Sequence, residues 1–433
     1  MLETDPISQA GETLLRLAAD AQLREDDQRL ARAIVFGVMR HALTLDYWYG
    51  SLLNRPSSSL DERLRLCLRM AACQQWLLSR IPDYAIVSET VDLARSVFRC
   101  DSRQTGFLNA VLRKMVALPT PPELPAGNRI AELATRYSFP REVAGLFVKK
   151  FGTHKAADIM EKCNREPDFI NRVNTLKVGR DQLAAGIREM GYDVQPGTLA
   201  PESLIVSGDK SFHDLLHSDL FDAGNFYVQD EASQLVAHLV APQAGERILD
   251  LCSAPGGKAT HMAELSGGRA RITATDFSET RLALVQENRQ RLETPGLEIA
   301  PMDEVRASTE LFDAILVDAP CSGIGTVRRH PEIRYRITPD SLNRQADRQQ
   351  EVLDQAASLL RPAGRLIYST CSVSDAENCQ VIRKFLARHP DFKVRQTSMT
   401  HPAGLPFHAD GFYRTWPSHP DLDGFEAVVL DRT

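Results

Sequence analysis

Two cysteines of this chain directly follow stretches that read as buried strands. Cys321 comes after FDAILVD (312–318) within DAPCSG, and Cys371 comes after RLIYST (365–370) within STCS. Because the carboxyl ends of parallel strands meet at one edge of a sheet, we expect the two thiols to lie close together. A thiolate is a nucleophile whose covalent adduct divides a difficult reaction into easier steps. The pair therefore predicts covalent catalysis at a sheet edge.

A simpler explanation exists for each cysteine alone, because a cysteine at a strand end is usually a small buried side chain. The two together, one preceded by proline and the other by Ser-Thr, favour chemistry. SDAE (374–377) has the pattern of a capping box, so we expect a helix to start directly after Cys371. A helix N-terminus favours a thiolate, which makes Cys371 a candidate nucleophile. Residue chemistry alone does not fix which of the two thiols attacks.

A glycine-rich segment has the features of a cofactor site. ILDLCSAPGGK (248–258) reads as a buried strand, a turn that lets a ligand approach the backbone, and a helix N-terminus. The next strand, RITATD, ends in Asp276, whose carboxylate is placed to accept hydrogen bonds from ribose hydroxyls. Asp303 ends the third strand, LEIAPMD, where we expect it to face an adenine. The absence of GxGxxG and of a P-loop lysine disfavours a dehydrogenase and a P-loop enzyme.

A basic stretch follows the first cysteine motif. RRHPEIRYR (328–336) holds four arginines, although the net charge of the whole chain is −6. The net charge excludes a protein that coats nucleic acid without regard to sequence, but it does not exclude a local basic site. We expect this stretch to contact RNA phosphates and to stack a base on its tyrosine, the alternative being a solvated loop. The candidate RNA-binding residues are Arg328, Arg329, Arg334, Tyr335 and Arg336.

The elements that must position these residues fall into three expected domains, since 433 residues are too many for one core. Residues 1–128 read as all-helical and end in LPTPPELPAGN (118–128), whose four prolines make a stiff spacer. Residues 129–225 read as a small α/β subdomain. From 226 to 433 strands and helices alternate, which predicts a doubly wound, mostly parallel sheet. GFEAVVLDR (424–432) is expected to pair antiparallel.

Composition narrows the setting of the protein. The eight cysteines form no CxxC pair and no even spacing, which favours reduced thiols in a cytosol over disulfides or zinc. No apolar run approaches the length of a membrane-spanning helix. We therefore expect a cytoplasmic protein without a bound metal.

The motifs together resemble the RNA 5-cytosine methyltransferases of the NOL1/NOP2/Sun family. The resemblance rests on LDLCSAPGGK, DAPCSG and STCS, with NRVNTLK (171–177) and YVQDEASQLVA (227–237) similar to upstream motifs of that family. The helical block, with FLNAVLRKM, resembles the NusB-like RNA-binding domain of the bacterial Sun-type (Fmu) rRNA methyltransferases. Two positions depart from the pattern: Ile324 stands where threonine is frequent, and Glu426 where a second aromatic residue is common.

The resemblance implies a Rossmann-like class I methyltransferase domain that binds S-adenosyl-L-methionine. It places Asp276 at the ribose, Asp303 on the adenine side, and Asp318 near both the methyl donor and the target base. It makes Cys371 the nucleophile and Cys321 the residue that aids product release. The turn that would line the methionine and ribose consists of Cys252, Ser253, Ala254, Pro255, Gly256, Gly257 and Lys258.

The implied reaction forms 5-methylcytosine in small-subunit (16S) rRNA through a cysteine–carbon 6 adduct. Addition of a thiolate to carbon 6 activates carbon 5, and Asp318 is the candidate proton donor to ring nitrogen 3. We expect a monomer that binds RNA. The alternatives are a tRNA cytosine-5 methyltransferase, and an RNA-binding protein in which the NusB-like domain acts and the methyltransferase domain is vestigial.

Overall fold

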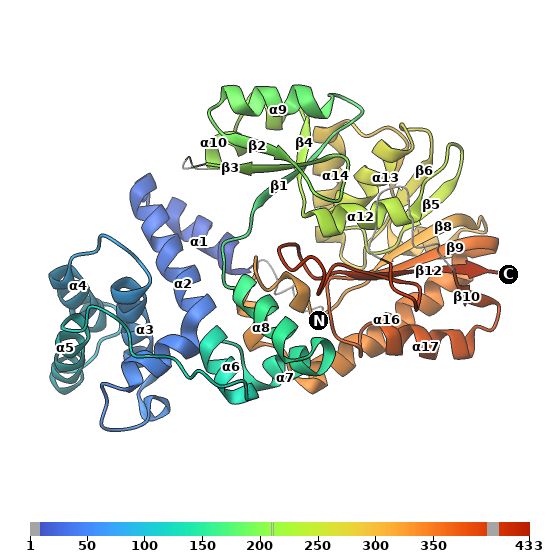
Figure 1. Ribbon diagram of the computed structural model, residues 1–433. Coiled ribbons are helices and arrows are strands. Elements are labelled where there is room, and N and C mark those ends of the chain that lie inside the picture. The colour runs from blue at the N-terminus through green and yellow to red at the C-terminus, as the bar shows by residue number, and fades with distance from the viewer. Residues whose placement is uncertain (1–8, 209, 211, 396–406) are drawn as a thin grey trace. The chain divides into compact units, whose positions relative to one another are not determined.

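The chain forms two compact units. The computed structural model describes residues 9–208, 210, 212–395 and 407–433. Unit 1 consists of residues 1–165 together with 327–337, and unit 2 consists of residues 166–326 and 338–433 (Figure 1). The basic stretch therefore leaves the sheet-containing unit and returns to the helical one. No helix in the described part of the chain is long and apolar enough to span a membrane.

Unit 1 is all-helical, as the sequence predicts. Its core forms because apolar side chains recur every three or four residues and face one another, as Leu64 and Leu68 of α3 do. The rings of Trp48 and Trp76 meet edge to face with centroids 5.8 Å apart. The helices of this unit are α1 (Gln9–Asp20), α2 (Glu25–Gly50), η1 (Ser57–Ser59), α3 (Glu62–Trp76), α4 (Asp83–Ser96), α5 (Ser102–Val116), α6 (Ile130–Tyr137), α7 (Arg141–Phe151), α8 (Thr153–Lys162) and η3 (Pro331–Tyr335).

The proline-rich spacer carries neither helix nor strand over residues 118–128. The helices that follow it, α6 to α8, nevertheless group with the helices that precede it rather than with the strands after residue 165. The contact is made by α2, where Thr44 Oγ1 donates to Thr135 O at 2.7 Å and Leu43 N donates to Ser138 Oγ at 2.9 Å. These bonds satisfy the C-terminal end of α6, so the polypeptide continues the helical unit across the spacer.

Arg334 lies at the centre of unit 1 and not on its surface. Its side chain is fully buried, and its Nη1 donates to Arg40 O at 3.0 Å, to Ser138 O at 3.2 Å and to Asn164 Oδ1 at 2.8 Å. The guanidinium carbon also lies 4.0 Å from the centroid of the Phe139 ring. The expectation that Arg334 contacts an RNA phosphate is therefore wrong. No part of the guanidinium is accessible, and its N–H groups donate to the acceptors just named.

Unit 2 contains two sheets. The smaller one is wholly antiparallel, with the strand order β2-β3-β1-β4, and α9 accompanies it (Figure 1). It confirms the mixed α/β character expected for this part of the chain. Its elements are β1 (Phe169–Val173), α9 (Arg180–Glu189), β2 (Asp193–Pro196), β3 (Ser203–Ser207), α10 (Phe212–Leu216), α11 (Asp219–Asp222) and β4 (Phe226–Val228).

The larger sheet has the order β10-β12-β9-β8-β5-β6-β7, with β11 paired to β12. The pairs among β9, β8, β5, β6 and β7 are parallel, and β12 runs antiparallel to β9, which confirms both sequence expectations. The elements are α12 (Glu231–Val240), β5 (Arg247–Asp250), α13 (Gly257–Leu265), β6 (Arg271–Ala274), α14 (Glu279–Leu292), β7 (Leu297–Ile299), α15 (Met302–Ala307), β8 (Phe312–Asp318), η2 (Ile324–Thr326), α16 (Pro339–Leu359), β9 (Leu360–Thr370), α17 (Cys379–Arg388), β10 (Phe392–Val394), β11 (Phe412–Arg414) and β12 (Glu426–Arg432).

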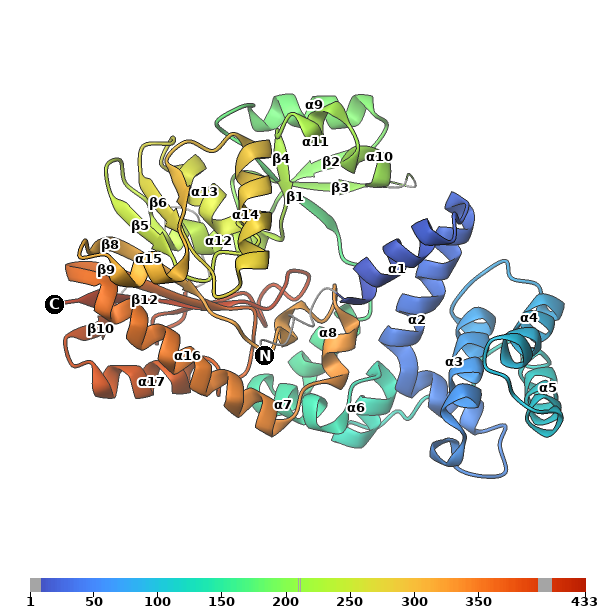
Figure 2. The ribbon, with the colours of Figure 1, turned by 180° about the vertical axis from the view of Figure 1, so that it is seen from behind.

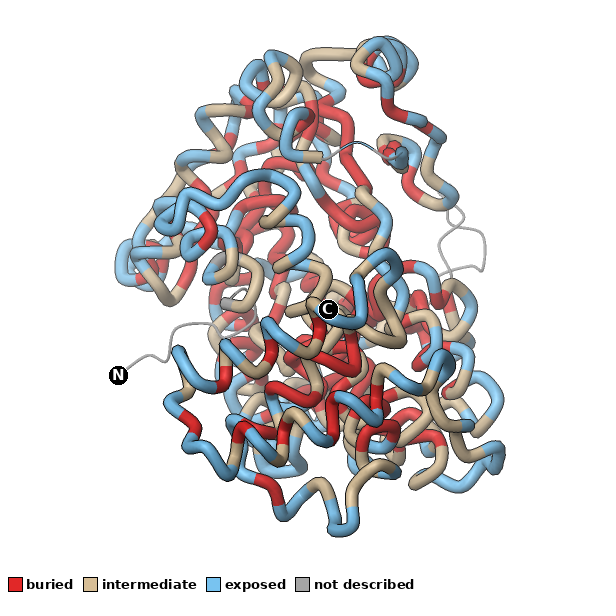
Figure 3. The backbone as a smooth tube through the Cα atoms, turned by 90° about the vertical axis from the view of Figure 1, so that its left-hand side faces the viewer, coloured by how far each residue is buried: buried red, intermediate tan, exposed pale blue. Residues whose placement is uncertain are grey.

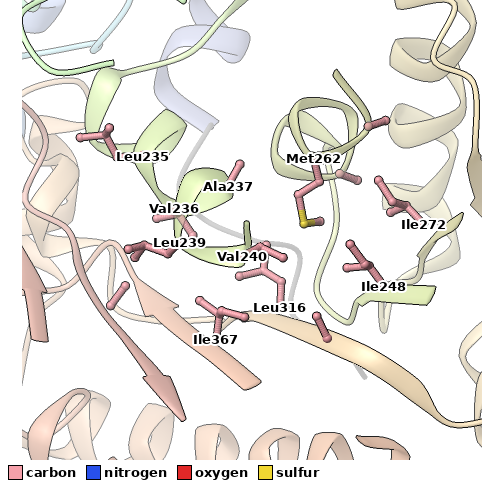
Figure 4. Packing of buried hydrophobic residues seen from close by; sticks show 14 of the residues in the cluster. Leu235, Val236, Ala237, Leu239, Val240, Ile248, Met262, Ile272, Leu316 and Ile367 are labelled. Carbon is pink, nitrogen blue, oxygen red and sulfur yellow. The ribbon is translucent and has the colours of Figure 1, made fainter. Parts of the chain in front are cut away.

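Helices cover both faces of this sheet, because successive strand residues point to opposite sides (Figure 2). Ile248, Leu316 and Ile367 face the side covered by α12 and α13, where Val236 and Met262 pack against them (Figure 4). The alternate residues of the same strands face α16 and α17. Most residues of β5 and β8 are buried, as expected for a doubly covered sheet, and Figure 3 colours the buried residues of the chain red.

The contribution of buried Arg334 to the stability of unit 1 can be tested by substitution. Arg334→Met keeps the apolar stem but removes the donors to Arg40 O, Ser138 O and Asn164 Oδ1, so unit 1 should lose about 1.5–3 kcal/mol of stability. Calorimetric unfolding of the full chain measures the loss. Arg336→Met, at an exposed neighbour, is the control and should change the stability by less than about 0.5 kcal/mol. Equal effects of the two substitutions would contradict the structural role.

Candidate active site

The two cysteines meet where β8 and β9 end. The sulfur atoms of Cys321 and Cys371 lie 3.3 Å apart, both thiols are free, and both residues are partly exposed. This confirms the expected proximity. The hydrogen bond with Cys371 and burial raise the pKa of Cys321 well above its ordinary value. Cys321 is therefore held as a thiol, and either sulfur can be the donor in the contact between the two residues.

Gly325 joins the two cysteine loops at a point where no side chain fits. Its N–H donates to Cys371 O at 2.9 Å, and its carbonyl accepts from Gly424 N at 2.8 Å. A Cβ atom at this position would stand 1.8 Å from Gly424 O. The glycine of DAPCSGIG is thus required for the close approach of the Cys321 loop to the Cys371 backbone. Ile324 beside it is fully buried, so packing accounts for it.

The buried carboxyl group of Glu377 ties the same two loops together from below. Its Oε1 accepts from Ser322 N at 2.7 Å, and its Oε2 accepts from Ser322 Oγ and from Ser372 Oγ, both at 2.5 Å. Gln349 Nε2 adds a bond at 3.3 Å. Burial raises the pKa of Glu377 despite these hydrogen bonds, which act to lower it.

The expected capping box is wrong because Glu377 makes these hydrogen bonds instead. Helix α17 begins at Cys379, and Glu377 turns toward the serines that follow the two cysteines instead of toward a helix end. Cys371 therefore has no helix N-terminus directly after it. A tertiary hydrogen-bond network has replaced a local one, because it satisfies a buried carboxyl group with more donors than a cap provides.

A charged pair lies beside the thiols. Lys258, at the start of α13, donates from Nζ to Asp318 Oδ2 at 2.6 Å, and Asp318 Oδ1 accepts from Ser369 Oγ at 2.7 Å. Burial lowers the pKa of Lys258, but the charge of Asp318, its hydrogen bond and Cys371 together raise it above the ordinary value.

The glycine-rich turn leads from β5 into α13. Gly256 has φ +98°, and a Cβ on Gly257 would stand 2.8 Å from the Tyr227 ring, so both positions require glycine. Arg172, fully buried in β1, supports the turn from the smaller sheet. It donates to Gly257 O and Thr260 Oγ1 and pairs with Glu264 at 2.8 Å. Arg172 lies within NRVNTLK, but its partners on α13 lie about 90 residues away along the chain. Its role was therefore not visible in the sequence.

Two acidic residues at this end of the sheet offer acceptors to a ligand. Asp250 ends β5 and is buried, and neither of its oxygens has a hydrogen bond of ordinary geometry among the described residues. Burial and the nearby Asp318 charge raise the pKa of Asp250 to about 7. Asp276 accepts from Ala254 N at 3.2 Å and from Ser278 N at 3.1 Å, which fixes its carboxylate against the turn. Sequence reasoning did not select Asp250, although it ends the strand before the glycines.

Other expected residues lie in less specific surroundings. The strand before Asp303 ends at Ile299, and Asp303 lies in the first turn of α15 with its side chain 96% exposed. The expected strand end is therefore wrong, because Pro301 starts a helix there. Burial raises the pKa of Cys252 well above its ordinary value, so this residue stays a thiol.

The basic stretch belongs to unit 1. Tyr335 and Arg336 are exposed, Arg329 is half-buried, and Arg328 is buried at 7% exposure. The Tyr335 hydroxyl donates to Met39 O at 2.9 Å, which leaves its ring at the surface of the helical unit.

Three family models match the chain. The model described as 16S rRNA methyltransferase RsmB/F covers residues 237–430, the NusB family covers residues 3–117, and the RsmF/B-like ferredoxin-like domain covers residues 143–213. These matches coincide in order with the larger sheet, the N-terminal helices and the smaller sheet.

Relatives and solved structures match over nearly the whole length. A probable ribosomal RNA small subunit methyltransferase B of Bacillus subtilis (strain 168) is 31% identical over 93% of this chain and 90% of its own length. The ribosomal RNA small subunit methyltransferase B of Vibrio cholerae is 32% identical, covering 96% and 92%. The crystal structure of the protein PH0851 is 28% identical with a TM-score of 0.77, covering 95% of this chain and 91% of that one.

The Glu377 network predicts that this carboxyl group sets the distance between the thiols. Glu377→Ala removes the carboxylate that accepts from three donors of Ser322 and Ser372, so the loops should separate. Dibromobimane, which bridges neighbouring thiols, should link Cys321 to Cys371 several-fold more slowly in this variant, as measured by mass spectrometry of the bridged peptides. Glu351→Ala, at an exposed site on α16, is the control. Unchanged bridging would show that Glu377 does not position the pair.

Proposed function

Because the chain belongs to the RsmB/F family of 16S rRNA methyltransferases, we propose that it methylates carbon 5 of a cytosine in that RNA through a covalent adduct with Cys371. Methylation of 16S rRNA that depends on S-adenosylmethionine is the activity of the family, and RNA is its partner. This agrees with the resemblance found in the sequence. The observation that carries the finer proposal is the pair of free thiols whose sulfur atoms lie 3.3 Å apart.

The residues of the glycine-rich turn fit S-adenosylmethionine, which supplies the methyl group. The open acceptors of buried Asp250 suit the ammonium of its methionine part, and Asp276 suits the ribose hydroxyls. Gly256 and Gly257 allow backbone contact at the N-terminus of α13, with Cys252 to Pro255 and Lys258 around them. Asp303, exposed in α15, is proposed for the adenine side, and Asp318 for the side of the target base.

In the proposed first step, the Cys371 thiolate bonds to carbon 6 of the cytosine. Electron density moves into the ring, and carbon 5 becomes the nucleophile that accepts the methyl group. Asp318 contacts the base, and the Lys258 ammonium paired with it supplies the positive charge that stabilises the electron-rich ring. Both Asp318 oxygens accept hydrogen bonds, which favours Lys258 over Asp318 as the source of a proton.

Cys321 acts in the second step. Its pKa is raised mainly by its contact with Cys371, and that contact changes once the Cys371 sulfur is bonded to carbon. Cys321 then loses its own proton to solvent, and its thiolate accepts the proton that leaves carbon 5. The electrons of that C–H bond re-form the ring double bond and expel Cys371 as a thiolate. The closeness of the two sulfur atoms supports this proposed division of roles.

The wider setting is proposed on the same basis. The reaction uses one chain and no metal ion, and it takes place in the cytoplasm, where the RNA substrate is made. Arg328, Arg329, Tyr335 and Arg336 are proposed to contact RNA, of which the exposed Tyr335 and Arg336 are the best placed. The intact thiol pair and the Lys258–Asp318 bond argue against a vestigial methyltransferase domain. Methylation of tRNA instead of 16S rRNA is an outcome that the adduct experiment below distinguishes.

Asp276 gives a direct test of the cofactor site. Asp276→Ala should weaken S-adenosylmethionine binding by about 1.5–3 kcal/mol, because charge-assisted hydrogen bonds to the ribose are lost. Asp276→Asn, which keeps one acceptor and the bond to the turn, should lose less. Calorimetric titration measures both. Unchanged affinity in the alanine variant would refute the ribose contact.

The two cysteines should give opposite results on a denaturing gel. Cys321→Ser still attacks and transfers the methyl group once, but it releases product slowly, so a labelled protein–RNA band should accumulate with labelled methyl donor. Cys371→Ser should form no band, because a serine hydroxyl is far less ionised and less nucleophilic than a thiol.

The reverse pattern, with the band only in Cys371→Ser, would assign the attack to Cys321. A band in neither variant would defeat the covalent mechanism. Running 16S rRNA and tRNA in parallel identifies the substrate, since only the true substrate is trapped.

A further inference from the structure

A cluster of metal-ligand residues lies behind the cofactor turn. Glu202 directly precedes β3, His238 lies in the last turn of α12, and His261 lies in α13. Their ligand atoms all lie within 4.8 Å of one another. The sequence analysis expected no metal because it found no CxxC pair, but these three residues come from distant parts of the chain and form no sequence motif.

The ring nitrogens of buried His261 lack ordinary hydrogen-bond partners among the described residues. Its side chain is fully buried, and neither ring nitrogen makes a hydrogen bond of ordinary geometry to the described residues. The nearest ionic partner of Nε2 is Glu202 Oε2 at 3.7 Å. A buried polar group without a partner usually signals a missing water or ion.

The other two residues converge on the same point. His238 Nε2 lies 3.0 Å from Glu202 Oε2, and the rings of His238 and His261 are 5.3 Å apart at an interplanar angle of 86°. One carboxylate oxygen thus lies 3.0 Å from one imidazole Nε2 atom and 3.7 Å from another.

We propose that Glu202, His238 and His261 bind a divalent transition metal, with Zn²⁺ the best match. Two imidazoles and one carboxylate form a common zinc ligand set, and water takes the fourth position. Ca²⁺ and Mg²⁺ are disfavoured because they prefer oxygen ligands. Glu202 and His238 side chains are 13% and 14% exposed, so an ion can enter from solvent.

Arg172 places a positive charge near this site. Its guanidinium is paired with Glu264 at 2.8 Å and hydrogen-bonded to Gln229 Oε1, so the Glu264 carboxylate offsets part of that charge. The ion would join β3 of the smaller sheet to α12 and α13 of the larger one. It lies on the helix that carries Lys258 but takes no part in the proposed methyl transfer, so its function would be to hold α13 in place.

The test uses the full chain after removal of metal with a chelator. Calorimetric titration with Zn²⁺ should give one tight site per chain, and Co²⁺ should give the intense visible absorption of tetrahedral coordination. Zn²⁺ should also raise the melting temperature. Glu202→Gln and His238→Ala should weaken binding by at least about 10–100-fold, a loss that follows even from removing an outer-shell partner of a metal.

His217→Ala is the matched control, because the stacked rings of His213 and His217 form a second histidine pair that can also bind added metal. This variant should keep the tight site and its cobalt spectrum. Glu202→Gln preserves the size of the buried side chain and guards against loss of folding. Absence of a one-to-one tight site in the native chain, or equal binding by Glu202→Gln and the native chain, would overturn the proposal.

Discussion

The hydrogen-bonded ion pair between Lys258 and Asp318 is the interaction on which the active site depends. A lysine and an aspartate at 2.6 Å in a largely buried place are stable only together, because removal of either leaves an uncompensated charge. Lys258 starts the helix that follows the glycine-rich turn, and Asp318 ends the strand that leads to Cys321. The pair therefore fixes the cofactor side of the sheet against the cysteine side, and its positive end also faces the sulfur of Cys371.

Around this pair the fold supplies a frame of buried polar groups, each bridging segments far apart in sequence. Glu377 and Gly325 bind the two cysteine loops to each other, and Arg172 carries the glycine-rich turn from the neighbouring sheet. A buried polar network destabilises the fold when one of its groups lacks a hydrogen bond, and it makes the structure rigid when every group is bonded. The consequence here is that the two thiols are held 3.3 Å apart, and the contact with Cys371 and burial raise the pKa of Cys321. The proposed assignment of attack to Cys371 and of release to Cys321 comes from the resemblance to the family.

Features that depend on strand periodicity were predictable from the sequence, and features that depend on tertiary partners were not. The runs before Cys321 and Cys371 are continuous and apolar, as strands covered on both faces must be, so the meeting of the thiols followed from topology. No helix starts directly after Cys371, because the Glu377 carboxylate accepts hydrogen bonds from Ser322 and Ser372 instead of capping a helix. Arg334 looked like part of a basic surface because charge runs are usually solvated, whereas it is buried and donates to two backbone carbonyl groups and to the side chain of Asn164. Neither outcome has a local signature in the chain.

Locating the cysteine that carries the RNA adduct shows directly whether Cys371 attacks the cytosine. 16S rRNA transcribed with 5-fluorocytidine should trap the native enzyme, because fluorine at carbon 5 cannot leave as a proton does and release is blocked. Digestion with protease and nuclease, followed by mass spectrometry, identifies the peptide that carries the nucleotide. If Cys371 attacks carbon 6, the modified cytosine, which bears both fluorine and the added methyl group, is attached to Cys371. Attachment to Cys321 would contradict it.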